Sequence, residues 1–352
     1  MKKASVDFKN ITKEYSGNVT AVDNISCTFE PGSLTTLLGP SGCGKTTSLR
    51  LIAGLERATS GSVFIDNEDV TLLPATDRDV SMVFQSYALF PHMSVIENVS
   101  YGLKMSNIPK NQCISKAMEN LSLVGLEGYE NRMPSELSGG QQQRVAVARA
   151  IVLEPKVLLF DEPLSNLDAK LRRQVREDIR ELQQKVGLTT IYVTHDQEEA
   201  LAISDKIIVM NNAVIAQEGS PKDLYSHPKT SFVANFVGDA NIVKATIKKR
   251  EDHRYYIRFG EIDITLTSSF NLQNNISVAV RPEAITLHSD KISNSISATI
   301  IKVSYVGNHY QYTVSSSLGD LYIVSEDVVN HYNLGDKIYL TFQMNGLSIL
   351  SD

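Results

Sequence analysis

Unbroken, largely apolar runs recur along the first two thirds of the chain, separated by longer segments with helical character. Clear examples are Leu34–Leu38, Val157–Phe160 and Thr190–Val193. Runs of this length without alternation are typical of parallel strands buried on both faces. Because such strands alternate with helices, residues 1–236 are predicted to form an α/β domain, in which residues 86–155 are richer in helix.

A different pattern begins after Phe236-Val237-Gly238. Residues 241–352 contain short strands in which apolar and polar positions alternate, and Asn, Gly, Ser and Asp separate these strands. The clearest ones are Ile262–Leu266, Ile276–Val280, Ala298–Val303, Gln311–Val314 and Ile338–Phe342. This pattern predicts a small all-β, barrel-like domain over residues 237–352.

Composition excludes some functions. The net charge of −6 argues against non-specific binding of DNA or RNA, so we expect no nucleic-acid partner. No run of 18 apolar residues occurs, and the first residues lack the apolar stretch of a signal peptide. The cysteines Cys27, Cys43 and Cys113 have neither metal-site spacing nor an even disulfide framework, so we expect free thiols in a reducing cytoplasm.

The strongest candidate for chemistry lies between the run that ends at Leu38 and a helical stretch, Ser48–Leu55. A strand, a glycine-rich loop and a helix form a phosphate-binding P-loop, because the glycines let several backbone N–H groups point at one anion. The start of the helix adds positive potential. The loop residues are Gly39, Pro40, Ser41, Gly42, Cys43, Gly44, Lys45, Thr46 and Thr47. Lys45 is suited to the β- and γ-phosphates of ATP, and Thr46 to Mg²⁺.

Two carboxylates, Asp161 and Glu162, follow the apolar run Val157–Phe160. Side chains at the carboxyl end of a buried parallel strand face the crevice where α/β proteins bind ligands. We expect Asp161 to hold Mg²⁺ through water and Glu162 to activate the attacking water as general base. A solvated strand end is the alternative interpretation.

The octet Leu-Ser-Gly-Gly-Gln-Gln-Gln-Arg at residues 137–144 precedes a helical run, Val145–Val152. Ser138 is suited to cap this helix, and Gly139 and Gly140 expose backbone N–H groups at its start. The segment is therefore a second anion site. Two phosphate sites on one chain suggest that two chains share each nucleotide.

This octet is the signature of the ATP-binding cassette (ABC) family, and the chain resembles an ABC transporter ATPase subunit. The resemblance implies a P-loop NTPase cassette with a helical subdomain. It also implies a head-to-tail homodimer, in which each ATP lies between the P-loop of one copy and the signature loop of the other, including Gln141.

Further site residues follow from the same resemblance. Tyr15 matches the aromatic residue that stacks on adenine, although an ordinary strand tyrosine is the alternative. Gln85 matches the glutamine loop that contacts Mg²⁺ and reports to the membrane partner, and Asp168 matches the D-loop at the dimer interface. His195 matches the switch histidine on the γ-phosphate, with a structural histidine as the alternative.

Two surface features have open interpretations. Tyr87–His92 follow Gln85 after one residue, Ser86, and an exposed cluster of Tyr, Leu and Phe would form a docking surface for membrane subunits. Packing under the helical lobe is the alternative. The amphipathic segment 169–186 carries many charges, among them Arg172, which we interpret as a solvated outer face.

In the tail, Val278–Glu283 and Val303–Gly307 resemble the OB-like, TOBE-type regulatory domain of importer ATPases. One cassette with this tail is similar to ATPases of binding-protein-dependent importers. Val209–Gly219 and Phe236–Asn241 most resemble the ferric-iron and polyamine branch. The resemblance implies ferric iron as cargo, with a polyamine (spermidine or putrescine) or phosphonate as alternatives and an exporter as a further one. It also implies two membrane permease subunits, a substrate-binding protein, and a peripheral place on the cytoplasmic face of the bacterial inner membrane.

Overall fold

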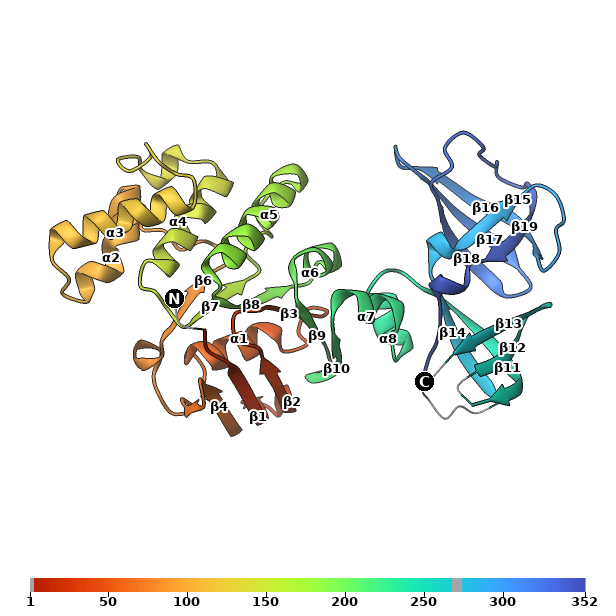
Figure 1. Ribbon diagram of the computed structural model, residues 1–352, viewed down its shortest axis with the longest axis horizontal. Coiled ribbons are helices and arrows are strands. Elements are labelled where there is room, and N and C mark those ends of the chain that lie inside the picture. The colour runs from red at the N-terminus through yellow and green to blue at the C-terminus, as the bar shows by residue number, and fades with distance from the viewer. Residues whose placement is uncertain (1–2, 253, 268–273, 352) are drawn as a thin grey trace. The chain divides into compact units, whose positions relative to one another are not determined.

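The computed structural model describes residues 3–252, 254–267 and 274–351. These residues divide into two compact units, Met1–Pro221 and Lys222–Asp352 (Figure 1). The first unit mixes helices and strands, and the second is mostly strand. The predicted fold class, an α/β cassette followed by a small all-β domain, is confirmed.

Six strands of the described chain form the central sheet of the first unit, in the order β10-β9-β3-β8-β7-β6. Neighbouring strands from β9 to β6 run parallel, and β10 is antiparallel to β9 at one edge. Their bounds are β3 Leu34–Leu38, β6 Val80–Val83, β7 Val157–Asp161, β8 Thr189–Thr194, β9 Lys206–Asn211 and β10 Val214–Gly219.

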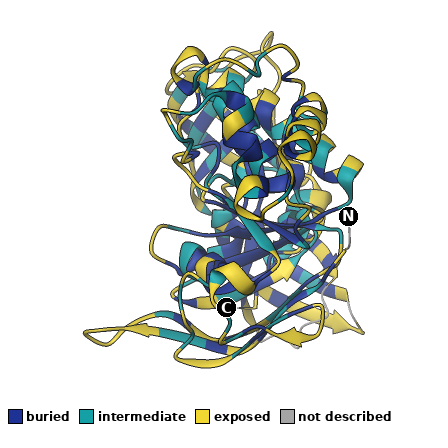
Figure 2. Cartoon of the chain, turned by 90° about the vertical axis from the view of Figure 1, so that its left-hand side faces the viewer, coloured by how far each residue is buried: buried dark blue, intermediate teal, exposed yellow. Residues whose placement is uncertain are grey.

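The apolar runs lack alternation because both faces of this sheet are covered. Leu159 and Ile191 belong to a core that includes residues of α1, whereas Leu158 and Tyr192 belong to a core with α4 and α5. Every residue of β3 and β8 is buried. The interior strands are largely dark blue in Figure 2, while the helices keep exposed residues along one face.

A second, antiparallel sheet has the order β2-β1-β4-β5 and shares a core with α1. Its strands are β1 Val6–Tyr15, β2 Val19–Phe29, β4 Ser60–Ile65 and β5 Glu68–Asp69. The helices of this unit are α1 Lys45–Ala53, α2 Val95–Met105, α3 Lys110–Leu123, α4 Gly139–Ile151, α5 Ala169–Val186 and α6 Gln197–Ile203, with short 3₁₀ turns at Ala75–Asp77 and Pro134–Glu136.

Helices α2, α3 and α4 pack around a small core of their own, which contains Val99, Leu121 and Val145. Figure 1 shows them gathered on one side of the first unit, away from α1. Helix α4 begins at Gly139, six residues before the helical run predicted from Val145, because Ser138 and the third helical residue cap each other reciprocally.

Tyr87 is buried, with 6% of its surface exposed, and packs in the core beside α4 and α5. Tyr87 and Ala88 both have positive φ angles, and Arg149 of α4 donates hydrogen bonds to their two carbonyl oxygens. The exposed cluster predicted at Tyr87–His92 is therefore wrong for Tyr87, for which packing is correct.

The described part of the second unit contains two antiparallel five-stranded sheets around one apolar core. The first has the order β13-β12-β11-β14-β20 and the second β15-β19-β16-β17-β18. The strands are β11 Asn241–Glu251, β12 Arg254–Phe259, β13 Ile262–Thr267, β14 Asn275–Val280, β15 Ile285–His288, β16 Ile296–Tyr305, β17 Tyr310–Ser316, β18 Gly319–Ser325, β19 Lys337–Phe342 and β20 Leu347–Ile349, with 3₁₀ turns at Pro282–Ala284 and Met344–Gly346. The predicted strands lie within these bounds, and the curled sheets are consistent with an OB-like domain.

Helices α7 (Pro221–Ser226) and α8 (Ser231–Phe236) are held by a buried arginine of the second unit. The Arg281 guanidinium donates to the carbonyl oxygens of Tyr225 and Ala234 and lies 4.0 Å from the centre of the Tyr225 ring. The compact units divide at Pro221, and the domain boundary at residues 236/237 stays a prediction.

The C-terminal end of helix α1 is capped by another buried arginine, Arg78. The Arg78 side chain is 5% exposed, and its Nη1 donates to the carbonyl oxygens of Leu51 and Ile52 at 2.6 and 2.9 Å. Its Nε donates to the carbonyl oxygen of Leu73 at 3.0 Å. Since the last carbonyls of a helix have no partner within the helix, Arg78 supplies their hydrogen bonds.

Replacing Arg78 by Met should therefore remove the side-chain donor from the carbonyl oxygen of Ile52, and leave that of Leu51 with only the backbone N–H of Gly54 at 3.4 Å. We expect the free energy of unfolding of the first unit to fall by about 3 kcal/mol. Urea denaturation followed by far-UV circular dichroism measures this. Arg57→Met, at an exposed position, is the matched control. Equal stability of both variants would contradict a capping role for Arg78.

Candidate active site

The loop Gly39–Gly44 joins β3 to α1 and needs glycine at both ends for close packing. A Cβ atom on Gly39 would lie 2.4 Å from the carbonyl oxygen of Met210, and one on Gly44 would lie 2.2 Å from that of Ala21. Gly44 also has a φ of +104°, which side chains rarely adopt. The loop is therefore fixed between β9 and β2.

The middle of this loop is open. Ser41 and Gly42 are exposed, Pro40 and Thr47 are partly buried, and a Cβ atom on Gly42 would meet nothing within 4 Å. Gly42 has a φ of +79°, so the chain turns sharply just before the first turn of α1. An anion can approach the backbone N–H groups from this side, where the helix adds positive potential.

Lys45 lies underneath the loop and is 5% exposed. Its Nζ donates to the carbonyl oxygens of Gly39 and Pro40 at 2.7 and 2.9 Å, and it lies 3.8 Å from Cys43 Sγ. Burial raises the pKa of the Cys43 thiol, although Lys45 opposes this shift. The loop thus holds a cation against its own carbonyl oxygens, within reach of any anion bound above.

Thr46 connects α1 to β7. Its Oγ1 donates a hydrogen bond of 3.1 Å to Oδ1 of Asp161, the last residue of β7. Burial raises the pKa of Asp161, while the hydrogen bond from Thr46 and the positive charges of Arg50 and Lys45 lower it. A bound divalent cation would favour the ionised carboxylate. A hydroxyl and a carboxylate side by side are oxygen ligands of the kind that Mg²⁺ prefers, so these residues fit the metal.

Glu162 and His195 face each other from neighbouring strand ends. The Glu162 Oε2 atom lies 3.2 Å from Nδ1 of His195. Glu162 has a φ of +45°, and its backbone N–H donates to the carbonyl oxygen of Val193 in β8 at 3.0 Å. A non-glycine residue held in this region stores strain, which is common at functional sites.

Two loops beside this pair are connected. Nδ2 of Asn166 donates to the backbone carbonyl oxygen of Gln85 at 3.0 Å, so the glutamine segment after β6 is tied to the segment after β7. Gln85 itself is exposed. Asp168 caps α5, because its Oδ1 accepts from the backbone N–H of Leu171 at 2.9 Å.

The signature segment lies at the start of α4. Ser138 and Gln141 form a capping box: the backbone N–H of Gln141 donates to Ser138 Oγ at 3.4 Å, and that of Ser138 donates to Gln141 Oε1 at 2.9 Å. A Cβ atom on Gly140 would lie 2.9 Å from Leu171 of α5. One on Gly139 would lie 3.0 Å from Leu167. The two glycines are thus explained in part by helix packing.

Tyr15 ends β1 and is 38% exposed. The Lys13 Nζ lies 4.8 Å from the centre of its ring. A ring at a strand end with one exposed side has room for a flat ligand, and stacking on adenine stays a prediction.

The structure brings most predicted residues to one place. The phosphate loop follows β3, His195 follows β8, and Asp161 and Glu162 follow β7, and these three strands are neighbours in the sheet (Figure 1). The signature residues are separate: in the part of the first unit that the structure describes, no hydrogen bond or ion pair joins them to the phosphate loop. The two segments that are predicted to bind phosphate therefore begin different helices, α1 and α4.

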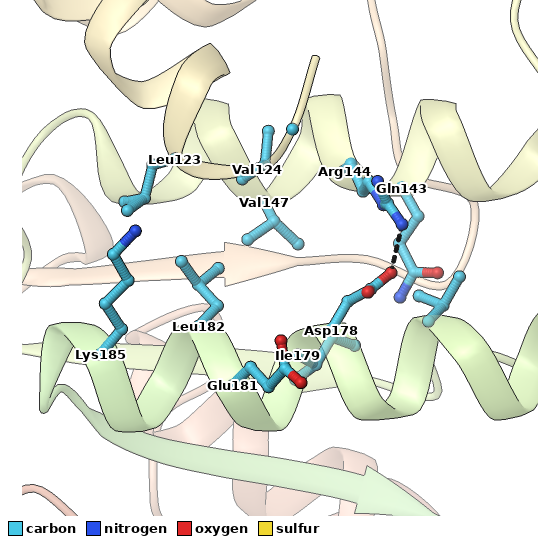
Figure 3. A pocket seen from close by; sticks show the side chains of 12 residues that line it. Leu123, Val124, Gln143, Arg144, Val147, Asp178, Ile179, Glu181, Leu182 and Lys185 are labelled. Carbon is cyan, nitrogen blue, oxygen red and sulfur yellow. Dashed lines mark hydrogen bonds and ion pairs between the residues drawn. The ribbon is translucent and has the colours of Figure 1, made fainter.

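A cavity of about 260 Å³ lies elsewhere, between α4, α5 and the end of α3. Figure 3 shows Val147 and Leu182 pointing into the space between the two helices, and the ion pair of Arg144 and Asp178 at one end. Within the described structure, the buried side-chain amide of Gln143 has no hydrogen-bond partner. This cavity takes no part in the arrangement around the phosphate loop.

Sequence reasoning missed Arg172. The charges of segment 169–186 are predicted to form a solvated face, but the Arg172 side chain is only 35% exposed and pairs with Asp196, which caps α6, and with Glu199 of α6. Glu199 is 4% exposed, and burial raises the pKa of its carboxyl. An arginine four residues after a D-loop aspartate was the available signal.

Comparison with known proteins agrees with this geometry. The family model described as "ABC transporter" matches residues 22–165, and the model described as "TOBE domain" matches residues 278–350. The solved structure of cbiO1 from Clostridium perfringens, part of an ABC transporter complex, is 28% identical, covers 62% of this chain and 89% of its own, and gives a TM-score of 0.58. The dimeric structure of MJ0796, a bacterial ABC transporter cassette, is 32% identical, covers 61% of this chain and 98% of its own, and gives 0.55.

Curated relatives match over the full length. The "Fe(3+) ions import ATP-binding protein FbpC" of Brucella abortus is 52% identical and covers 100% of this chain and 99% of the relative. The protein of the same name from Escherichia coli is 48% identical and covers 99% of each. No helix in the described ranges is both long and apolar enough to cross a membrane. The chain therefore belongs to the ATP-binding cassette transporter family, and it is an ATPase coupled to transport.

Proposed function

We propose that this chain energises a ferric-iron importer. The assignment of ferric iron as the transported substrate rests on the full-length match, at 48–52% identity, to proteins named as Fe(3+) import ATP-binding proteins. In this proposal two copies form a head-to-tail homodimer on the cytoplasmic face of the bacterial inner membrane. They act on two permease subunits that receive iron from a substrate-binding protein, and the tail domain contributes to dimerisation and regulation.

ATP binds with its phosphates over the loop Gly39–Thr47. Lys45 releases its hydrogen bonds to the carbonyl oxygens of Gly39 and Pro40 and donates to oxygens of the β- and γ-phosphates instead. Thr46, Asp161 and Gln85 would hold Mg²⁺, which neutralises phosphate charge when it is bound. Tyr15 stacks on adenine. The 3.1 Å contact between Thr46 and Asp161 supports this assignment, since two of the oxygen donors are already adjacent.

Hydrolysis depends on the pair after β7 and β8. Glu162 orients the attacking water in line with the leaving group and accepts its proton, and His195 holds the γ-phosphate. The 3.2 Å separation between Glu162 Oε2 and His195 Nδ1 supports a shared role. Lys45 and the loop N–H groups stabilise the charge that develops on the phosphoryl oxygens.

The second copy completes each site. Ser138 and Gly140 of the partner subunit lie against the γ-phosphate, with Gly139 and Gln141 beside them. Asp168 lies at the same interface. ATP then bridges the two copies, and its hydrolysis removes the bridge and lets them separate. The placement of the signature segment away from its own phosphate loop supports this arrangement.

Glu162→Gln should keep ATP binding but slow hydrolysis about 100-fold or more, because the amide cannot accept the proton. We expect a stable dimer with Mg-ATP, measured by size-exclusion chromatography with light scattering. Glu177→Gln, at an exposed carboxylate of α5, is the control: it should hydrolyse ATP like the wild type and should not accumulate a more stable dimer with Mg-ATP than the wild type does. Wild-type turnover in Glu162→Gln would remove Glu162 from this role.

The cargo is tested by uptake in cells from which the gene is deleted. We expect loss of labelled ferric iron uptake, with normal uptake of labelled putrescine. Rescue should succeed with the wild-type gene and fail with Glu162→Gln. Normal iron uptake with reduced putrescine uptake would replace iron by a polyamine. If neither changes, phosphonate import or an export role would be tested instead.

A further inference from the structure

Arg172 lies in the first turn of α5, directly after the D-loop that ends at Asp168. Its Nη2 donates to the backbone carbonyl oxygen of Leu167 at 3.2 Å. The backbone N–H of Arg172 donates to the backbone carbonyl oxygen of Asp168 at 2.8 Å. The guanidinium is therefore fixed to the loop that we place at the dimer interface.

The other side of the guanidinium faces the residues that follow His195. Arg172 Nη1 lies 3.5 Å from Oδ2 of Asp196, and Nε lies 3.9 Å from Oε1 of Glu199. Asp196 adjoins His195 in the chain and caps α6, where its Oδ1 accepts from the backbone N–H of Glu199 at 3.1 Å. A movement of Arg172 therefore reaches the His195 backbone through one residue.

Glu199 is anchored rigidly from the strand that precedes His195. Its Oε2 accepts a hydrogen bond of 2.8 Å from Thr194 Oγ1 and one of 3.2 Å from the Tyr192 hydroxyl. Both donors belong to β8, which is buried along its whole length. Asp196 and Glu199 thus form a hydrogen-bonded frame directly after His195, whose side chain is exposed.

A cavity of about 70 Å³ lies between this frame and the proposed catalytic pair. Glu162 and His195 line one part of it, and Arg172, Asp196 and Glu199 line another. Two carboxylates, those of Asp196 and Glu199, lie within 4 Å of the guanidinium, and the carboxylate of Glu162 lines the same cavity. Arg172 Nε is buried and has no hydrogen-bond partner among the described residues, so one donor of the guanidinium is left unsatisfied beside Glu199.

We propose that Arg172 is a positioning residue that couples the D-loop to His195 through Asp196 and Glu199, and so sets the rate of hydrolysis rather than the affinity for ATP. The inference rests on the proposed roles of Glu162 and His195. A planar guanidinium can contact Leu167 and both carboxylates together, and a lysine ammonium cannot reproduce this geometry.

The test compares ATP turnover of full-length Arg172→Gln, Arg172→Lys and the control Arg173→Gln. Arg173 is the next residue of α5, and its exposed side chain pairs with Glu177 instead. We expect Arg172→Gln to lower kcat about tenfold or more, because small displacements of reacting groups are costly. KM for ATP should change by less than about twofold, and Arg172→Lys should not restore the rate.

A merely structural role would give a different result. It would lower the thermal midpoint and weaken the binding of a fluorescent ATP analogue, and Arg172→Lys would rescue it in part. The double variant Arg172→Gln/Asp196→Asn adds a second criterion. If the two residues act as one unit, its kcat should be close to that of the worse single variant, whereas multiplied losses would contradict coupling.

Glu162→Gln in the same assay separates the two proposals. Normal turnover in Glu162→Gln would contradict the proposed catalytic role of Glu162, and with it the basis of the Arg172 inference. If Glu162→Gln is inactive but Arg172→Gln has the kcat of Arg173→Gln, the positioning role alone is overturned.

Discussion

The hydrogen bond between Thr46 and Asp161 joins the two parts of the molecule on which the site depends. Thr46 belongs to the first turn of α1, which follows β3. Asp161 ends β7, a buried strand that is separated from β3 by β8 in the sheet. The contact therefore requires the order β3-β8-β7, with all three strands parallel, so that their carboxyl ends meet at one edge. His195, between them at the end of β8, is placed near Glu162 by the same constraint.

The loop around this contact is specified by packing as much as by its ligand. Gly39 and Gly44 leave no space for a Cβ atom against β9 and β2, whereas Gly42 is open. Arg78 caps the far end of α1. The loop is packed against β9 and β2 at its two ends and is open at Gly42. Its N–H groups are therefore in place before an anion binds, which limits the entropy that is lost on binding.

Much of this could be predicted from sequence. The runs Leu34–Leu38 and Val157–Phe160 match buried strands because both faces of the sheet are covered. The cluster at Tyr87 could not be predicted, because its burial depends on Arg149 of a distant helix and on a left-handed backbone that the local pattern does not show. Arg172 was missed for a similar reason, since its carboxylate partners lie at the start of α6 and within it, more than twenty residues away along the chain.

The most direct test of this account is the Mg²⁺ dependence of ATP binding, measured by isothermal titration calorimetry on the wild type and Asp161→Asn. If Thr46 and Asp161 form the metal side of one site with the phosphate loop, Mg²⁺ should strengthen ATP binding to the wild type. Asp161→Asn should lose that gain and keep the affinity for metal-free ATP. The same Mg²⁺ gain in both proteins would contradict the account.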